Sequence, residues 1–397
     1  MLKKRFFTML VVAAVLALLQ PAHAQTAPGL LGQDSTRRVI TTAVQFLLIS
    51  PDARSAGMGD VGVAIDGDAN ATHWNPSKLA FAEDEWGVAV SFSPWLRNLV
   101  NDMSLSYLSA YKRLDKRRTL AASMRYFDMG SLQFTDAIGN PIQDFIPREF
   151  AIDGTYAFQL SEKMSMAGTA RFIHSNLAGS ISNGTVQGGG TRPGNTVAVD
   201  FSMFYKTPLS LGSTDADMAF GFNISNIGAK ISYNNPEQRD YLPANLRLGT
   251  AFNARFNPRN RLTLALDFNK LLVPTPPILN ADGTLRAGKE YDRSLLNSVF
   301  GSFTDAPDGL GEELQEVILS FGTEYWYNDI FAIRAGYYYE SPNKGDRNYF
   351  SVGLGLRYQM FGFDFAYLVP NQQNHPLADT LRFTLLLKLD KSNPDAE

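Results

Sequence analysis

Side chains that could do chemistry are few and widely separated in this chain. The four histidines are His23, His73, His174 and His375, and there is no cysteine. The sequence has no His-Glu-x-x-His pair, no Gly-x-Ser-x-Gly elbow and no Walker-type phosphate loop. Metal, nucleophilic and phosphate chemistry each need such residues at fixed spacings. We therefore predict no catalytic residue, no metal ligand and no cofactor, which argues against an enzyme.

The charged residues instead follow a two-residue alternation. From Trp86 onward, segments of about ten residues alternate apolar and polar side chains, as in 350–358. A period of two is typical of β-strands. The polar faces carry full charges, which a hydrated barrel lumen accommodates and the core of a soluble sandwich does not. The charged residues of these faces are Arg125, Asp153, Arg171, Asp200, Asp267, Glu324, Arg334, Arg357 and Asp364.

The lengths of the segments and of their connections predict a membrane barrel. Strands of about 9–12 residues are long enough to cross hydrocarbon at a tilt. Fourteen are expected, beginning near residues 86, 103, 118, 149, 163, 196, 216, 246, 261, 316, 330, 347, 361 and 380. Short connections alternate with long ones near 129–148, 175–195, 226–245 and 272–315. The predicted fold is all-β, a transmembrane antiparallel barrel of about 14 strands, with a soluble sandwich as the weaker alternative.

The N-terminal residues are typical of an export signal. Basic residues at Lys3–Arg5, an apolar stretch to Leu19 and the small-x-small pattern at Ala22–Ala24 predict a signal peptide, 1–24. We expect a periplasmic arm and hatch at 25–85, the barrel at 86–390 and a periplasmic tail at 391–397. An even strand number would leave both termini in the periplasm. The predicted location is the bacterial outer membrane.

Composition excludes other classes of protein. After the signal there is no run of 18 apolar residues that would form a membrane-spanning helix. The net charge of −3 gives no basic surface for nucleic acid, so none is expected as a partner. Without cysteine, neither disulfides nor thiolate metal sites can stabilise the fold.

Two stretches before the barrel resemble a known family. The stretch Ala53–Gly59 (Ala-Arg-Ser-Ala-Gly-Met-Gly) and the later Trp74–Leu79 (Trp-Asn-Pro-Ser-Lys-Leu) are similar to the N-terminal hatch of FadL-like outer-membrane barrels. Over the mature chain the sequence most resembles the PorV (LptO) and PorQ family of the type IX secretion system of Bacteroidetes. The resemblance implies a structural plug that could also touch a ligand, formed by Arg54, Gly57, Met58, Gly59, Trp74, Asn75 and Pro76.

The same resemblance implies a carrier for secreted proteins. Members of that family associate with the SprA-type translocon barrel and bind cargo through its conserved C-terminal domain. They bring the cargo to a PorU-type sortase and attachment complex at the cell surface. Outer-membrane lipid or lipopolysaccharide is the remaining expected contact. The alternative is a FadL-like transporter of hydrophobic compounds, which should show an apolar lumenal pocket and strand defects that open the wall.

The longest loop, near 272–315, is the candidate surface for cargo or translocon. Prolines stiffen its start and acidic residues follow, although a simple solvated loop would look the same. The candidate residues are Pro274, Pro276, Pro277, Asp305, Asp308, Glu312 and Glu313. For the lumenal charges, among them Asp267, Arg334, Arg357 and Asp364, we favour an ion-pair network over a permeation path.

Overall fold

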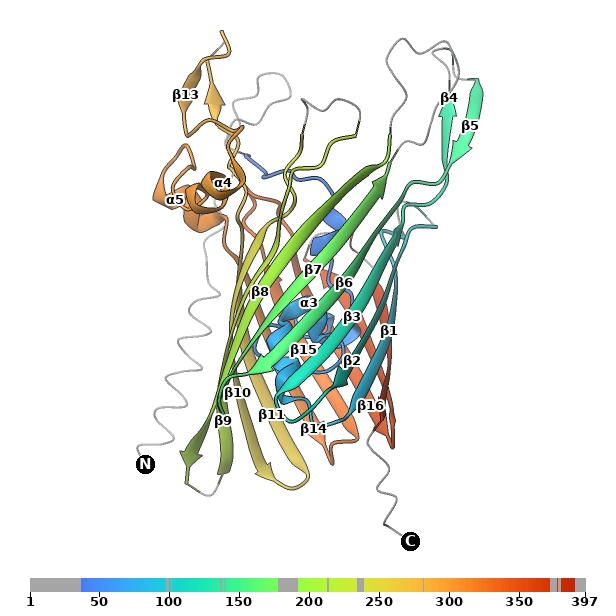
Figure 1. Ribbon diagram of the computed structural model, residues 1–397, viewed down its shortest axis with the longest axis vertical. Helices are drawn as coiled ribbons and strands as arrows, with labels where there is room; N and C mark the ends of the chain where they lie inside the picture. Colours follow the sequence, from blue (N-terminus) through green and yellow to red (C-terminus); the bar gives the residue numbers. More distant parts are fainter. Residues whose placement is uncertain are drawn as a thin grey trace. The chain divides into compact units, whose positions relative to one another are not determined.

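In the described part of the chain, fourteen strands close into an antiparallel barrel (Figure 1). The computed structural model describes residues 37–389 except 98, 99, 101, 136, 137, 139, 178–191, 213, 234–238, 281, 372–376, 378 and 379. The predicted signal peptide, most of the predicted arm and the predicted tail lie outside the described residues. The predicted fold is confirmed.

The wall strands follow one another around the barrel in chain order, and the last pairs with the first. Each begins within two residues of its predicted start. The strands are β1 (Trp86–Pro94), β2 (Ser104–Arg113), β3 (Arg118–Asp128), β6 (Arg148–Gln159), β7 (Met164–Asn176), β8 (Gly194–Leu211), β9 (Thr214–Gly228), β10 (Asn245–Asn257), β11 (Asn260–Leu271), β14 (Ile318–Tyr327), β15 (Phe331–Tyr339), β16 (Asn348–Tyr358), β17 (Phe361–Pro370) and β18 (Leu381–Leu389).

The two faces of each strand differ as the alternation predicts. On β16, Phe350, Val352 and Leu354 are exposed on the outer face, whereas Ser351 is buried inside. An apolar outer surface repeated around a closed barrel is what contact with lipid requires, and closure leaves no unpaired strand edge.

Connections alternate strictly between short and long. The short β14–β15 turn has Asn328 and Asp329 at φ 54° and 53°, a left-handed conformation that Asn and Asp tolerate well. The long connections gather at the opposite end, here called the long-loop end (Figure 1). They contain β4 (Leu132–Thr135), β5 (Pro141–Phe145), β12 (Ile278–Leu279), β13 (Leu285–Ala287), α4 (Leu295–Gly301) and α5 (Leu310–Gln315).

The residues before β1 form a folded segment that the wall surrounds, here called the hatch (residues 44–81; Figure 1). Its elements are η1 (Gln45–Leu48), α2 (Ala53–Ala56), α3 (Ala71–Trp74) and η2 (Pro76–Phe81). Buried alanines of α2 pack on Ala366 of β17, and Leu79 packs with alanines of several strands. Among the helices of the described residues, none is long and apolar enough to span a membrane.

Candidate functional site

The buried carboxylate of Glu324, on wall strand β14, joins the hatch to the wall. Asp52 accepts a hydrogen bond from the Ser55 amide (2.8 Å), which caps α2 and positions Arg54. The Arg54 guanidinium then donates two hydrogen bonds to Glu324 of β14, at 3.0 and 2.8 Å. Arg334 of β15 donates to the same carboxylate at 2.7 Å. A bidentate Arg–carboxylate contact fixes orientation as well as distance.

The ion pairs continue across the neighbouring strands. Arg334 also contacts Asp364 of β17 at 2.8 Å, and Arg357 contacts the same Asp364 at 2.8 Å. The predicted ion-pair network is thus confirmed for these three residues. Asp267 has a different role, because one of its oxygens accepts hydrogen bonds from the Gly62 and Val63 amides of the hatch, at 2.7 and 2.9 Å.

Glycines allow the hatch backbone to touch the wall backbone. Gly59 has φ +70°, and a Cβ there would lie 2.6 Å from the Tyr337 amide nitrogen. A Cβ on Gly336 of β15 would lie 2.0 Å from the carbonyl carbon of Met58, which is fully buried. A Cβ on Gly57 would lie 2.9 Å from Gly353 of β16. These contacts explain the glycine-rich sequence of the predicted hatch.

Trp74, Asn75 and Pro76 are buried at the junction of α3 and η2. The Trp74 indole donates to Asp52 at 2.6 Å. The Asn75 amide donates to the carbonyls of Val63 and of Met203 on β8, both at 3.0 Å. All seven predicted hatch residues therefore lie at hatch or hatch–wall contacts.

Two arginines that the sequence reasoning did not single out as site residues approach His73 from the wall. Arg125 lies 2.6 Å from Nδ1 of His73, and Arg247 donates to its carbonyl oxygen at 3.2 Å. Burial and the charges of these arginines hold the pKa of His73 well below its usual range, so the imidazole is neutral. Among the described residues, neither guanidinium forms an ion pair. The sequence offered no signal for this group because its members lie on separate elements.

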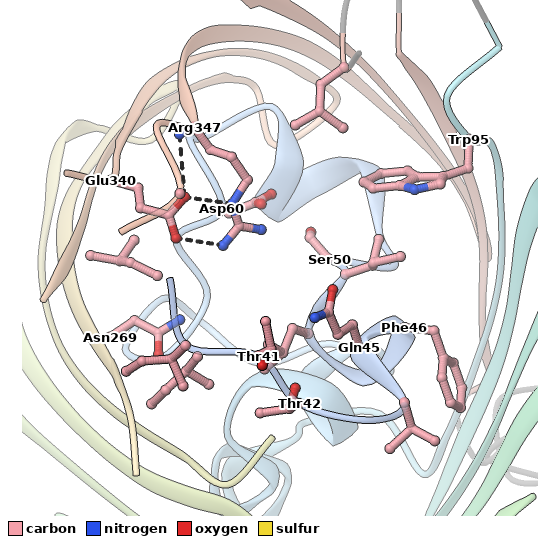
Figure 2. Close-up of a pocket in the computed structure, with 18 of the residues that line it drawn as sticks. Thr41, Thr42, Gln45, Phe46, Ser50, Asp60, Trp95, Asn269, Glu340 and Arg347 are labelled. Carbon is pink, nitrogen blue, oxygen red and sulfur yellow. Dashed lines mark hydrogen bonds and ion pairs between the residues drawn. The ribbon is translucent and has the colours of Figure 1, made fainter. Parts of the chain in front are cut away.

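Between the hatch and the long-loop end lies a cavity of about 770 Å³. Figure 2 shows Thr41, Gln45 and Ser50 around it, facing Trp95 and Asn269 of the wall region. Glu340 and Arg347 form an ion pair at 2.7 Å on one side. The lining combines aromatic, aliphatic and charged side chains, a mixture that ligand sites of this size share.

At the long-loop end, acidic residues of the predicted partner loop point inward. Glu312 accepts from Arg38 and from Lys344 (2.7 Å), and Glu313 accepts from Lys270 (3.0 Å). Burial alone would raise the pKa of Glu312, but the hydrogen bonds from Arg38 and Lys344 outweigh it and lower that pKa to about 2. These carboxylates attach the loop to the rest of the protein.

The remaining predicted loop residues differ in how far they are exposed. Asp305 is buried and paired with Arg293, whereas Asp308 is exposed and contacts Arg38. Pro274 is buried, and Pro276 and Pro277 are half-buried. A partner role for these residues stays a prediction.

Arg38 attaches the residues before the hatch to the long-loop end. It contacts Glu312 and Asp308 at the long-loop end, and the Ala43 amide donates to the Tyr241 carbonyl at 3.0 Å. The chain then runs from this end through the hatch to β1. Residues 37 and 38 therefore lie at the long-loop end, and the rest of the predicted arm lies outside the described residues. The local sequence could not show this, because Arg38 and Glu312 are 274 positions apart.

The two helices of the same loop, and Phe303 between them, expose large apolar side chains that were not among the predicted site residues. Their exposed fractions reach 73% at Phe300 and 74% at Leu310. The set, here called the apolar helix face, comprises Leu296, Phe300, Phe303, Leu310 and Leu314. Among the described residues, no group of three His, Asp or Glu side chains is arranged to hold a metal.

Solved structures with a similar fold are barrels of hydrocarbon transporters. A monoaromatic hydrocarbon channel, CymD, has 15% identity and a TM-score of 0.49 over 87% of this chain and 99% of its own. The Ralstonia pickettii toluene transporter TbuX has 13% identity and a TM-score of 0.46 over 85% and 98%. No curated protein matches the chain.

The family model of the type IX secretion system protein PorV matches residues 32–278, which include the hatch and the wall through β11. That match covers more than half of the chain. It places the closed barrel in the outer membrane and agrees with the resemblance carried by the hatch sequence. The chain therefore belongs to the PorV family of outer-membrane components of the type IX secretion system.

Proposed function

We propose that this protein is a non-enzymatic carrier that binds secreted proteins and moves them from the translocon to the cell-surface attachment machinery. The family match supports a place in the type IX secretion system. The finer role rests on the geometry of the lumen and the long-loop end. We infer that the signal peptide directs export, that the short-turn end faces the periplasm and that the long-loop end faces outward.

The attachment of the hatch to the wall is the observation that carries this proposal. Arg54 donates from Nε and Nη2 to a fully buried carboxylate, that of Glu324. Moving the hatch aside would leave Glu324 and Arg334 buried without Arg54, which costs several kcal/mol. Backbone contacts at Gly59 and Gly336 oppose the same movement. A barrel with so firmly held a hatch is better suited to binding at its outer end than to conduction.

The alternative, transport of hydrophobic compounds, would need an opening in the wall. The described wall strands contain two register shifts. One lies between Arg255 and Asn257, next to the short β10–β11 turn, and the other lies within the wall, between Val199 and Phe201 of β8 against β9. There Asp200 accepts from the Asn226 amide at 2.7 Å, and Arg171 binds Asp200 at 2.9 Å. Pairing resumes immediately beyond the shift. Because polar groups and paired strands occupy this position, we favour the carrier over the transporter.

The apolar helix face is the surface that we assign to the translocon. Monomeric soluble surfaces seldom gather so many exposed Leu and Phe side chains, and such patches commonly mark protein contacts. The buried carboxylates Glu312 and Glu313 hold α5 against Arg38, Lys270 and Lys344, so the face is presented on a fixed support. We propose that an SprA-type barrel docks here. We also propose that cargo and the PorU-type attachment complex bind at the same end of the barrel.

An affinity purification from native outer membranes tests the proposal. The tagged protein is extracted in mild detergent, and co-purifying proteins are identified by mass spectrometry. We expect a very large barrel and secreted proteins that share a C-terminal domain. Recovery of the barrel alone with bound fatty acids or other apolar molecules would contradict the proposal and favour the transporter.

Substitutions on the apolar helix face locate the contact. The variant Phe300→Gln with Leu314→Gln should fold but lose most of the translocon signal, since aromatic and aliphatic anchors dominate interface energy. Leu279→Gln is the matched control, because Leu279 is also exposed (55%) but lies on the β12–β13 hairpin. Equal recovery with both variants would remove the apolar helix face from the proposal.

A further inference from the structure

An apolar groove of about 350 Å³ lies on the outer face of the wall near the short-turn end. It crosses the seam where the last strand pairs with the first. In this seam Val88 of β1 pairs with Leu387 of β18, and Val90 pairs with Leu385. Apart from Gly362, the residues that line the groove are aliphatic or aromatic, namely Val88, Val90, Leu356, Tyr358, Phe361, Phe363, Leu385, Leu386 and Leu387.

Differences in side-chain size form the groove. Phe361 of β17 lies next to Leu387 in register, and both Phe361 and Tyr358 stand well out from the wall. Val88 and Leu387 are only half-buried between their neighbours, so they form the floor. An apolar cavity of about 150 Å³ binds benzene, so a groove of this volume has room for several carbons of an acyl chain.

A cation and an indole lie one register row closer to the short-turn end. Trp86 of β1 pairs with Lys112 of β2, and the Lys112 ammonium lies 4.3 Å from the centre of the Trp86 ring. Both side chains are exposed, and Lys112 forms no ion pair among the residues that the structure describes. Tryptophan and lysine are typical of the membrane–water interface, where lipid headgroups lie.

The strand ends around this pair carry more cations than carboxylates. The cations are Lys112, Arg113, Lys116, Arg117, Arg118 and Lys388, and the carboxylates are Glu83, Asp84, Glu85 and Asp115. Two of the carboxylates are already paired, Asp84 with Lys388 at 2.7 Å and Asp115 with Arg118 at 2.5 Å. A surplus of basic residues beside a membrane attracts anionic headgroups.

On the far side of the barrel, the cations at the same end are paired. Arg255 and Arg261 contact Asp329 at 3.1 and 3.4 Å, and Lys206 contacts Asp66 at 3.0 Å. A cation that already contacts a carboxylate has less to offer a phosphate. The combination of an unpaired lysine and an adjacent groove therefore distinguishes the β1–β18 seam from that side.

We propose that this surface binds one phospholipid with a net negative headgroup. Its phosphate lies at Lys112 beside Trp86, and one acyl chain lies in the groove. The order of the two features fits a lipid, because the cation and then the groove follow one another from the strand ends towards the middle of the membrane. The site goes beyond the proposed function, and only its assignment to the periplasmic leaflet rests on the orientation proposed above.

Native mass spectrometry of the purified full-length barrel in detergent tests the site. The probes are dioleoyl phosphatidylglycerol and dioleoyl phosphatidylcholine, which have the same acyl chains but differ in headgroup charge. One molecule of the glycerol lipid should be retained, with an affinity about fivefold or more above that of the choline lipid. Equal affinities for the two lipids would overturn the proposal.

A lysine variant and a matched control locate the headgroup. Lys112→Gln should remove the preference for phosphatidylglycerol. Lys163→Gln also removes an exposed lysine at the short-turn end, but Lys163 lies at the β6–β7 turn and does not line the groove. It should keep the preference. Loss of the preference in both variants would indicate a general charge effect and contradict the site.

A second pair of variants locates the acyl chain. Val90→Phe fills the groove and should weaken the retention of both lipids. Val199→Phe places the same ring on the outer face of β8, where Val199 is also exposed, and should leave retention unchanged. Equal retention by the two variants would overturn the assignment of the groove.

A protein is the other possible occupant of the groove. If the wild type retains neither lipid, and Val90→Phe loses a protein that co-purifies with the wild type, the lipid is replaced by a protein partner. This result is distinguishable from failure of the proposed function, because translocon and cargo association is measured at the long-loop end. Recovery of translocon and cargo together with equal binding of the two lipids would refute only the present inference.

Discussion

The two halves of the lumen differ in how their buried arginines are paired. At the hatch–wall contact, Arg54 and Arg334 share the carboxylate of Glu324, and each has a further acidic neighbour. Beside the cavity, Arg382 pairs with Asp60 at 3.1 Å, whereas Arg247 forms no ion pair among the described residues and donates to the His73 carbonyl oxygen at 3.2 Å. The comparison teaches that one barrel can hold a buried arginine either by sharing carboxylates or, as at Arg247, by hydrogen bonding to the neutral residue His73.

The two halves of the lumen also differ in where glycines lie. In the half that contains the hatch contact, Gly57, Gly59 and Gly336 let main chains touch. Around the cavity, larger side chains such as Trp95 and Arg347 line open space. Close backbone contact excludes water and ligand, whereas long side chains with space between them leave room for both.

Removal of the shared carboxylate is expected to have the largest effect. Glu324→Gln leaves Arg54 and Arg334 buried without an anion between them, and we expect a loss of about 3–5 kcal/mol in the free energy of unfolding. Urea unfolding in detergent micelles, followed by tryptophan fluorescence, measures it.

Asp329→Asn provides the control for this variant. Asp329 is 47% exposed and pairs with Arg255 at 3.1 Å on the surface, so its loss should cost less than about 1 kcal/mol. If both variants unfold at the same urea concentration, the buried pairs do not stabilise the hatch contact and the comparison fails.

A methyl group at Gly336 should have the next largest effect. The Cβ of Gly336→Ala would meet the Met58 carbonyl carbon at 2.0 Å, so the hatch or β15 has to shift. Overpacking of this kind costs about 1–3 kcal/mol. We expect the displaced hatch to raise the ion conductance of the barrel in planar bilayers.

Gly154→Ala is the control for Gly336→Ala, because it replaces a strand glycine that makes no contact with the hatch. A Cβ on Gly154 would meet nothing within 4 Å. Conductance should stay at the wild-type level. An increase in both variants would show that the hatch contact at Gly336 is not what closes the lumen.

The smallest effect is expected from acid at the long-loop end. The pKa of Glu312 is lowered to about 2, so its contribution to loop attachment is complete above its ordinary pKa and is lost as the pH falls through about 2. Protease cleavage of the loop should stay slow at pH 5 and accelerate only near pH 2–3, measured by timed digestion with pepsin.

Glu312→Gln tests the assignment of this pH dependence. The variant should be cleaved faster at pH 5, because Arg38 and Lys344 lose their shared carboxylate. Its cleavage rate should then change less between pH 5 and pH 2. An unchanged pH profile would place the titrating group elsewhere.

The sequence by itself determined the barrel. Strand number, strand starts and the facing of side chains depend on local alternation, and turn residues such as Asn328 and Asp329 mark the reversals. The seven predicted hatch residues came from the resemblance of two short local stretches to the hatch of FadL-like barrels. These properties can be predicted from the sequence because each depends on residues that are close together in the chain.

Tertiary structure alone decided which charges meet. Arg54 and Glu324 are 270 positions apart, and Arg38 and Glu312 are 274 apart. The acidic loop residues looked like a charged outer surface in the sequence, yet Glu312 and Glu313 of α5 are buried, and the loop exposes large apolar side chains such as Phe300 and Leu310. The physical reason is that pairing energy depends on distance and burial, and both arise only when the barrel closes around the hatch.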